Sequence, residues 1–333
     1  MKKTIALLLC VLLTAFAPLN AFANMGMGDR AAIFDPDLEG AYGLVRMDDG
    51  TLRDVGEGPL AGTEGWTGLK SIMFNGHCVI GLTEEGKVLL SDTGGLVKSY
   101  RMTDALKWKD IVSLEWNWIY LYGIDAQGTL HVTGGDDSNR RLVAHHKADG
   151  WKNIKQAAAN MDGVFALQTD GTVRLFEPNT DRYGAAEGWT DIVQIAVTDH
   201  TLFGLRADGT VVQCGRYEYS AAAGWTGVKE LCADGLPAVG AIMQDGTVAG
   251  DDSYRAIEGA ESWTGVRKLI ADTSWLYAIG PDGGLLTTRA MEISGEWHDL
   301  VDIWLDGSSI AGLRADGTVL YKNKPYETRI RQE

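Results

Sequence analysis

The chain has 333 residues, 45% of them hydrophobic, which is enough apolar material for a sizeable core and excludes a globally disordered protein. Its formal net charge is −15 and no basic stripe interrupts it, so we do not expect a nucleic-acid partner. The 42 glycines stand against only 7 prolines and follow no collagen-like period, which indicates many tight turns.

The first segment in chain order has the features of an export signal. Lys2 and Lys3 precede an apolar run that ends at the small-x-small site of residues 21–23. We therefore expect residues 1–23 to be a signal peptide cut after Ala23, and residues 24–333 to form one secreted or extracytoplasmic domain. That domain has 28 basic and 45 acidic residues, a balance of −17. No later apolar run reaches the roughly 18 residues of a membrane span.

A short glycine turn recurs along the rest of the chain, first in an N-terminal partial unit at 31–60. There a weak strand at 31–34 precedes the hairpin "AYGLVRMDDGTLRDVG". Glycine is retained in every copy while its neighbours vary, which predicts a backbone with positive φ in a hairpin turn. The eight glycines are Gly50, Gly86, Gly128, Gly171, Gly209, Gly246, Gly283 and Gly317.

A tryptophan precedes seven of these glycines by 20 residues, or by 21 in one unit, whereas the distance on to the next tryptophan varies from 14 to 23. A fixed spacing indicates a packed half of each unit and a variable one indicates loops or outer strands. One such residue per unit favours a structural role in packing between units. These landmark tryptophans, near which the units begin, are Trp66, Trp108, Trp151, Trp189, Trp225, Trp263 and Trp297.

The unit beginning at Trp189 illustrates the predicted elements. Strands are expected at 192–197, 202–207 and 210–215, joined by tight turns, and helical periodicity is absent. A three-stranded meander cannot bury both faces alone, so we expect an all-β fold, a single closed β-propeller of seven or eight short blades. The ring would close by sharing strands between the termini in a velcro-like way. Either "ETRIR" (327–331) completes the first of eight blades, or both termini share one of seven.

The pattern "W-T-[DG]-[IV]-x-x-[ILV]", followed by a small-residue–Leu pair and by "D-G-T-V", resembles the regulator-of-chromosome-condensation repeat in its short bacterial form. The resemblance covers nearly all of residues 24–333 and implies a β-propeller, most often with seven blades. The family includes a nucleotide-exchange factor that works on chromatin. It also includes a secreted bacterial relative, the type II β-lactamase-inhibitory protein, that binds an enzyme with one face of the ring. The export signal and the acidic balance favour the second kind of role.

We therefore expect a monomeric, non-enzymatic protein-binding module without cofactor or metal, which contacts another protein through one loop face. The candidate residues lie in or beside the turns that follow the landmark tryptophans by nine to twelve positions, and the repeat brings all such turns to one face. They are Trp116, Asn117, Trp118, Asn160, Asp162, Asp199, His200, Asp234, Asp272, Trp275 and Asp306. Clustered acids and aromatics suit a basic or aromatic partner surface, although Asn and Asp are also ordinary turn formers.

Three questions stay open at this level. The aromatic run "EWNWIYLYG" (115–123) fits either an exposed anchor or a packed strand, and with Trp275 it suggests carbohydrate or cell-envelope binding as an alternative function. The histidines at 77 and 200 show no acid partner in the sequence. Cys214 and Cys232 would form a disulfide if their strands adjoin, while free buried thiols are an equal alternative for them and for Cys78.

Overall fold

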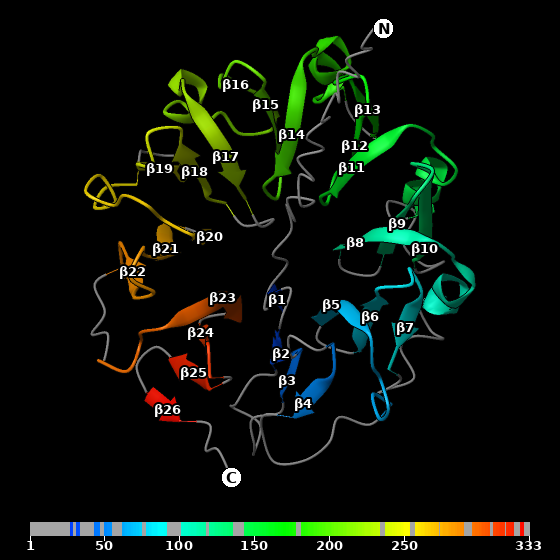
Figure 1. Cartoon of the computed structure of the whole chain (residues 1–333). Helices are drawn as coiled ribbons and strands as arrows, with labels where there is room; N and C mark the ends of the chain where they lie inside the picture. Colours follow the sequence, from blue (N-terminus) through cyan, green and yellow to red (C-terminus); the bar gives the residue numbers. More distant parts are fainter. Residues whose placement is uncertain are drawn as a thin grey trace, which may run out of the picture.

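The structure is a computed structural model. It describes residues 27–28, 31–33, 43–46, 50–54, 62–74, 78–91, 101–117, 120–135, 143–177, 181–233, 237–253, 257–272, 274–289, 295–306, 309–316, 318–322 and 327–329. These residues form 26 strands in eight antiparallel sheets, six of three strands and two of four. Figure 1 shows the eight sheets arranged around a common centre. The chain is a β-propeller, as the repeat predicts.

Seven sheets are built from the tryptophan-bearing units, and in each of them the first three strands form a meander in chain order. The first strands are β5 (Leu69–Phe74), β8 (Ile111–Asn117), β11 (Ile154–Ala159), β14 (Ile192–Val197), β17 (Val228–Cys232), β20 (Lys268–Asp272) and β23 (Leu300–Asp306). The second strands are β6 (Val79–Thr83), β9 (Tyr120–Asp125), β12 (Val164–Gln168), β15 (Thr201–Arg206), β18 (Val239–Met243), β21 (Trp275–Ile279) and β24 (Ser309–Arg314). The third strands are β7 (Val88–Leu90), β10 (Leu130–Gly134), β13 (Val173–Phe176), β16 (Val211–Gly215), β19 (Val248–Asp251), β22 (Leu285–Thr287) and β25 (Val319–Lys322).

The N-terminal unit forms the eighth sheet without a landmark tryptophan. It consists of β1 (Met27–Gly28), β2 (Ala31–Ile33), β3 (Gly43–Arg46) and β4 (Leu52–Asp54). This sheet lies between the last and the second sheet of the chain, because β1 contacts β23 and β2 contacts β5. The C-terminal strand β26 (Glu327–Arg329) pairs with β25 in its own sheet. The described strands thus use neither predicted form of strand sharing, and "ETRIR" does not complete the first blade.

Most first strands contact the first strand of the next sheet, and the first strands lie nearest the centre (Figure 1). The landmark tryptophans pack between sheets: Trp108 joins a core cluster with Leu82 and Val88 of the preceding sheet, and Trp189 joins one with Phe165 and Leu167. Both contacts fit the packing role between units that the sequence predicts for the landmark tryptophans. Short 3₁₀ segments, which the sequence analysis did not expect, lie in the variable connections at η1 (Met102–Lys107), η2 (Val143–Ala148), η3 (Gly184–Gly188) and η4 (Ala222–Gly224).

Two features of the structure explain why glycine recurs at the turns. All seven that the structure describes have φ between 75° and 85°, the left-handed region, as predicted, whereas Gly317 lies outside the described residues. Each turn also touches the next sheet: the carbonyl of Gly86 accepts the Ile111 N–H at 3.0 Å, and a Cβ on Gly86 would lie 2.7 Å from that nitrogen. A side chain would therefore separate two neighbouring sheets.

Candidate interaction site at the turn ends of two sheets

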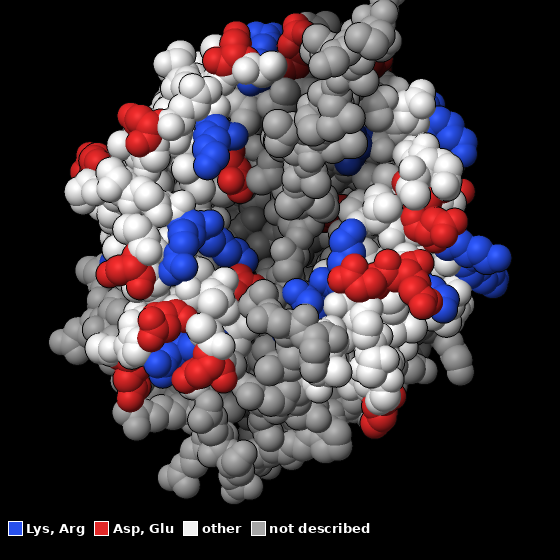
Figure 2. All heavy atoms as spheres, in the orientation of Figure 1, with Lys and Arg blue, Asp and Glu red and all other residues white. Residues whose placement is uncertain are grey.

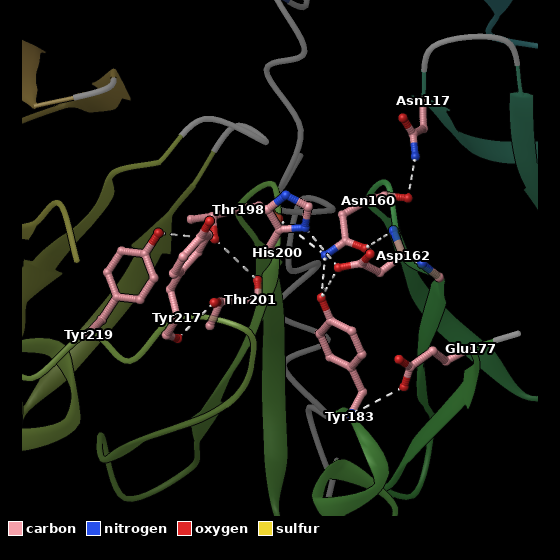
Figure 3. Close-up of polar contacts among 11 residues, drawn as sticks. Asn117, Asn160, Asp162, Glu177, Tyr183, Thr198, His200, Thr201, Tyr217 and Tyr219 are labelled. Carbon is pink, nitrogen blue, oxygen red and sulfur yellow. Dashed lines mark hydrogen bonds and ion pairs between the residues drawn. The ribbon is translucent and has the colours of Figure 1, made fainter. Parts of the chain in front are cut away.

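Where the first strands end, buried asparagines join one sheet to the next (Figure 3). The side-chain amide of Asn117 donates to the carbonyl of Asn160 at 3.0 Å, and the amide of Asn160 donates to the carbonyl of Thr198 at 3.2 Å. Both asparagines are about 5% exposed or less. They fix the turns of three consecutive sheets relative to one another, and their burial leaves little of them for a partner.

Asn160 also shapes the turn that carries the site. Its Oδ1 accepts the backbone N–H groups of Asp162 and Gly163 at 3.0 and 3.2 Å, the Asx geometry expected of a turn-forming asparagine. The turn presents Asp162 toward the neighbouring sheet. There Asp162 Oδ2 accepts hydrogen bonds from His200 Nδ1 at 2.8 Å and from the Tyr183 hydroxyl at 3.0 Å, as Figure 3 shows.

The protonation pattern of this group follows from its surroundings. Burial raises the pKa of the Tyr183 hydroxyl far above its ordinary value, so that hydroxyl remains a donor. The Asp162 carboxylate fixes the proton of neutral His200 on Nδ1, which leaves Nε2 as an acceptor directed away from the pair. Among the described residues, no hydrogen bond reaches this Nε2. Burial also raises the pKa of the neighbouring Asp199.

Two exposed side chains flank the polar pair. Tyr217 is 43% exposed, meets the His200 ring edge-on at 5.7 Å between centroids, and is held through its carbonyl by the Thr201 hydroxyl at 2.9 Å. Met161, next to Asp162 in the turn, is 53% exposed. We call Met161, Asp162, His200 and Tyr217 the turn-face cluster. It joins a fixed acid–imidazole pair to two exposed side chains of the types enriched at protein interfaces.

The other candidate residues divide into three groups. Trp116 is 5% exposed and packs in a core cluster, so the packed-strand alternative holds for it and the exposed-anchor alternative is wrong. Trp275 is partly buried, with the Arg289 guanidinium 6.0 Å from its ring centroid. Asp272 and Asp306 end β20 and β23, without described side chains, and Trp118 and Asp234 lie outside the described residues.

Neither the acid partner of His200 nor the contribution of Tyr183 and Tyr217 was predicted from the sequence. A signal for the first was present, because Asp162 and His200 both stand eleven residues after a landmark tryptophan, in adjacent repeats. Equivalent positions in neighbouring sheets of a propeller face one another. The tyrosines come from the variable connections, whose path the repeat does not define.

The described residues hold no cluster of three or more His, Cys, Asp or Glu side chains that could bind a metal ion. None of the described cysteines Cys78, Cys214 and Cys232 forms a disulfide, so the disulfide alternative for Cys214 and Cys232 is wrong. Cys214 and Cys232 belong to different inter-sheet clusters, and burial raises the pKa of the Cys214 thiol to about 12. Among the helical segments that the structure describes, none has the length and apolarity of a membrane span.

Comparison with known proteins supports the fold class. No family model and no curated protein matches the sequence. Among solved structures, the chain is similar to the computationally designed Ika8 protein, with a TM-score of 0.54 and 16% identity over 90% of this chain and 98% of that one. It is also similar to the CRINKLY WD40 ectodomain of the Arabidopsis thaliana receptor kinase ACR4, with a TM-score of 0.52 and 11% identity over 78% and 93%.

A structure of Kap60 bound to yeast RCC1 (Prp20) matches with a TM-score of 0.46 and 13% identity, over 79% of this chain and 75% of that one. Identities this low show a shared fold and no more. They give no support to a particular relationship with the type II β-lactamase-inhibitory protein.

Proposed function

We propose that this chain is an exported, monomeric, non-enzymatic protein-binding module that contacts its partner through the turn-face cluster. The observation that carries the proposal is the juxtaposition of the Asp162–His200 pair with two exposed side chains, Met161 and Tyr217, across adjacent sheets. The pair is preorganised by Asn160 and Tyr183, so binding would order few additional groups.

The chemistry of the cluster indicates the partner's surface. His200 Nε2 accepts a hydrogen bond while the imidazole is neutral, and the nearby Asp162 and Asp199 carboxylates favour a positively charged donor. Tyr217 and Met161 offer apolar contact beside it, and Arg216 lies 5.4 Å from the Tyr217 ring centroid. A protein surface with a basic or hydrogen-bond-donating side chain next to an aromatic one fits this arrangement.

The test is affinity capture from extracellular and cell-surface fractions, with the purified chain immobilised. We expect a saturable protein partner whose retention falls at least about tenfold with Met161→Ser/Tyr217→Ala. Leu106→Ser is the matched control, because Leu106 is 52% exposed on η1, away from the cluster. Equal retention by the wild type, the cluster variant and the control would refute the assignment of this site.

Carbohydrate binding remains the alternative, supported now by Trp275 alone among the described tryptophans proposed for it. A glycan array that compares the wild type with Trp275→Ala separates the two functions. Glycan binding that is lost in Trp275→Ala and kept in Met161→Ser/Tyr217→Ala would favour the alternative over the proposed function.

A further inference from the structure

One position of the repeat interrupts the regular strand pairing in most of the sheets. Six first strands carry a β-bulge at the fourth residue after the landmark tryptophan, where the register shifts between the residues on either side. A bulged residue is left unpaired, and bulges often re-aim a side chain at the rim of a barrel or beside a functional site. The residues at this position are Lys70, Val112, Lys155, Val193, Lys229, Arg267 and Val301, with Arg267 directly before β20.

Four of these seven residues are cations and three are valines. The valines at 112, 193 and 301 are 41%, 39% and 39% exposed, and they make up half of the exposed large apolar side chains of the described residues. Isolated exposed valines need no explanation. These three valines occupy the same repeat position on the innermost strands, so they form the apolar part of a single surface. We call the seven residues the cation–valine rim.

The cations of the rim reach toward the next sheet. Lys70 Nζ donates to the carbonyl of Val112 at 2.6 Å, and Lys155 Nζ donates to the carbonyl of Val193 at 3.4 Å. A carbonyl satisfies one donor of an ammonium group but does not neutralise its charge. Among the residues that the structure describes, no carboxylate forms an ion pair with Lys70, Lys155, Lys229 or Arg267.

Two carboxylates directly follow a rim residue in the chain, and both interact with cations. Asp302, one position beyond the rim, is paired with Lys268, and the half-buried Glu230 interacts electrostatically with Lys229 and Lys268. Acids further out, such as Asp170 and Asp208, bind the threonine of their own turn at 2.6–2.7 Å. Figure 2 agrees: Lys and Arg side chains gather around the central hollow, and most Asp and Glu side chains lie further from it.

We propose that the cation–valine rim binds an acidic protein segment with interspersed aliphatic side chains, at the mouth of the ring opposite to the turn-face cluster. Carboxylates of the segment would meet Lys70, Lys155, Lys229 and Arg267, while its aliphatic side chains would pack on the valines. The two sites lie at opposite ends of the same strands: Lys155 and Asn160 are five residues apart, about 16 Å along a strand. The proposal does not depend on the proposed function.

A protein segment fits this surface better than a nucleic acid does. The chain as a whole carries −15, which repels a polyanion at long range, whereas a short acidic segment interacts with the local positive ring within about a Debye length. The rim also lacks aromatic side chains for base stacking, and it offers aliphatic surface from which a phosphodiester backbone gains little.

The test measures binding of a labelled peptide of four Asp-Glu-Leu repeats to the purified chain by fluorescence anisotropy at low salt. We expect saturable binding that weakens at least about tenfold in Lys155→Glu/Lys229→Glu, because two attractive charges become repulsive. Lys107→Glu/Lys147→Glu makes the same change in net charge on η1 and η2, away from the rim, and should alter the dissociation constant by less than about twofold. Circular dichroism and thermal melting establish that both variants are folded.

Further variants test the valines of the rim separately from its cations. Val193→Ser/Val301→Ser should weaken binding about threefold, and a peptide with Ser in place of Leu should lose a similar factor. Met161→Ser/Tyr217→Ala should leave peptide binding unchanged, which keeps this test distinct from that of the turn-face cluster. No saturable binding, equal weakening by the two lysine variants, or tighter binding of an oligothymidylate of the same length would each overturn the proposal.

Discussion

At the scale of single residues, the repeat is governed by one steric pairing. In four units the ring of the landmark tryptophan lies against a glycine on the second strand, where added atoms would collide: a Cβ on Gly204 would be 2.9 Å from the Trp189 ring. Trp189 is itself 6% exposed and contacts the preceding sheet. The tryptophan therefore fills the space between two sheets, and the small residue on the second strand leaves room for its ring.

Trp189→Ala should remove much of this contact and leave a cavity. We expect the free energy of unfolding to fall by about 3–5 kcal/mol, the cost typical of a buried tryptophan. Urea denaturation measures it, with Val193→Ala as control, because Val193 is exposed and its truncation should cost less than about 1 kcal/mol. Equal losses in the two variants would contradict the packing role.

Gly204→Ala tests the other half of the pairing. The added methyl group should collide with the Trp189 ring and destabilise the chain by about 1–3 kcal/mol. Gly188→Ala is the matched control, since a Cβ at Gly188 meets nothing within 4 Å. That substitution should be neutral or slightly stabilising because it reduces the entropy of the unfolded chain. Thermal melting of both variants decides the point, and a stable Gly204→Ala would show that the tryptophan can shift without loss.

At the scale of elements, a residue six positions before the landmark tryptophan packs on the second strand of the preceding sheet in three of the units. Tyr183 meets Phe165 and Tyr219 meets Phe203, with ring centroids 4.7 and 5.0 Å apart. In an earlier unit this position holds His145, 1% exposed, whose Nδ1 lies 2.6 Å from the Tyr122 hydroxyl. The variable connections therefore contribute a repeated internal residue despite their different lengths.

The histidine makes this element sensitive to pH. Burial, with a smaller contribution from the nearby His146, lowers the pKa of His145 to about 4 in the folded chain. The unfolded chain takes up this proton near pH 6.5, so stability should fall as the pH decreases from about 6.5 toward 4. Linkage gives a loss of about 2 kcal/mol between pH 7 and pH 5.

Tyr122→Phe/His145→Tyr introduces the phenylalanine–tyrosine pair that the next two units have at these positions. It should remove most of the pH dependence of the free energy of unfolding. Urea denaturation at both pH values measures it. Carboxylates whose pKa is lowered, such as Asp125, lose their contribution only below about pH 4 and do not interfere. An unchanged slope in the double variant would assign the pH dependence to another group.

The elements also show what the sequence could and could not predict. Strands, glycine turns and tryptophan contacts were predictable, because the residues that form them recur at the same spacing in every unit. The N-terminal hairpin was predictable as well, but the place of its sheet in the ring was not, since β1–β4 has no landmark tryptophan and is placed by contacts with β23 and β5. The Asp162–His200 pair depends on a contact between sheets, and the burial of Trp116 depends on the direction of one side chain.

At the scale of the whole molecule, the sheets are connected by side chains that bridge the first strands. The Gln156 side chain donates to the Ile195 carbonyl and accepts its N–H at 2.8 and 2.9 Å, and Gln194 does the same with Leu231. Each bridge ties one sheet to its successor as a paired strand would. Stability is therefore shared between neighbours, as in other repeat folds, and the arrangement of the N-terminal sheet determines whether it is shared around the ring.

A chain that begins at Gly62 lacks β1–β4 and tests this directly. In an open array, loss of a terminal repeat removes one interface, and its effect stays with the adjacent sheet. In a ring the same deletion also uncovers β23, which is distant in sequence but contacts β1. We therefore expect hydrogen exchange to accelerate at residues 300–306 as well as at 69–74, while β14 at 192–197, on the other side of the ring, keeps its protection (Figure 1). Unchanged exchange at 300–306 would show that the N-terminal sheet does not stabilise the last one, and the ring would then be open between them.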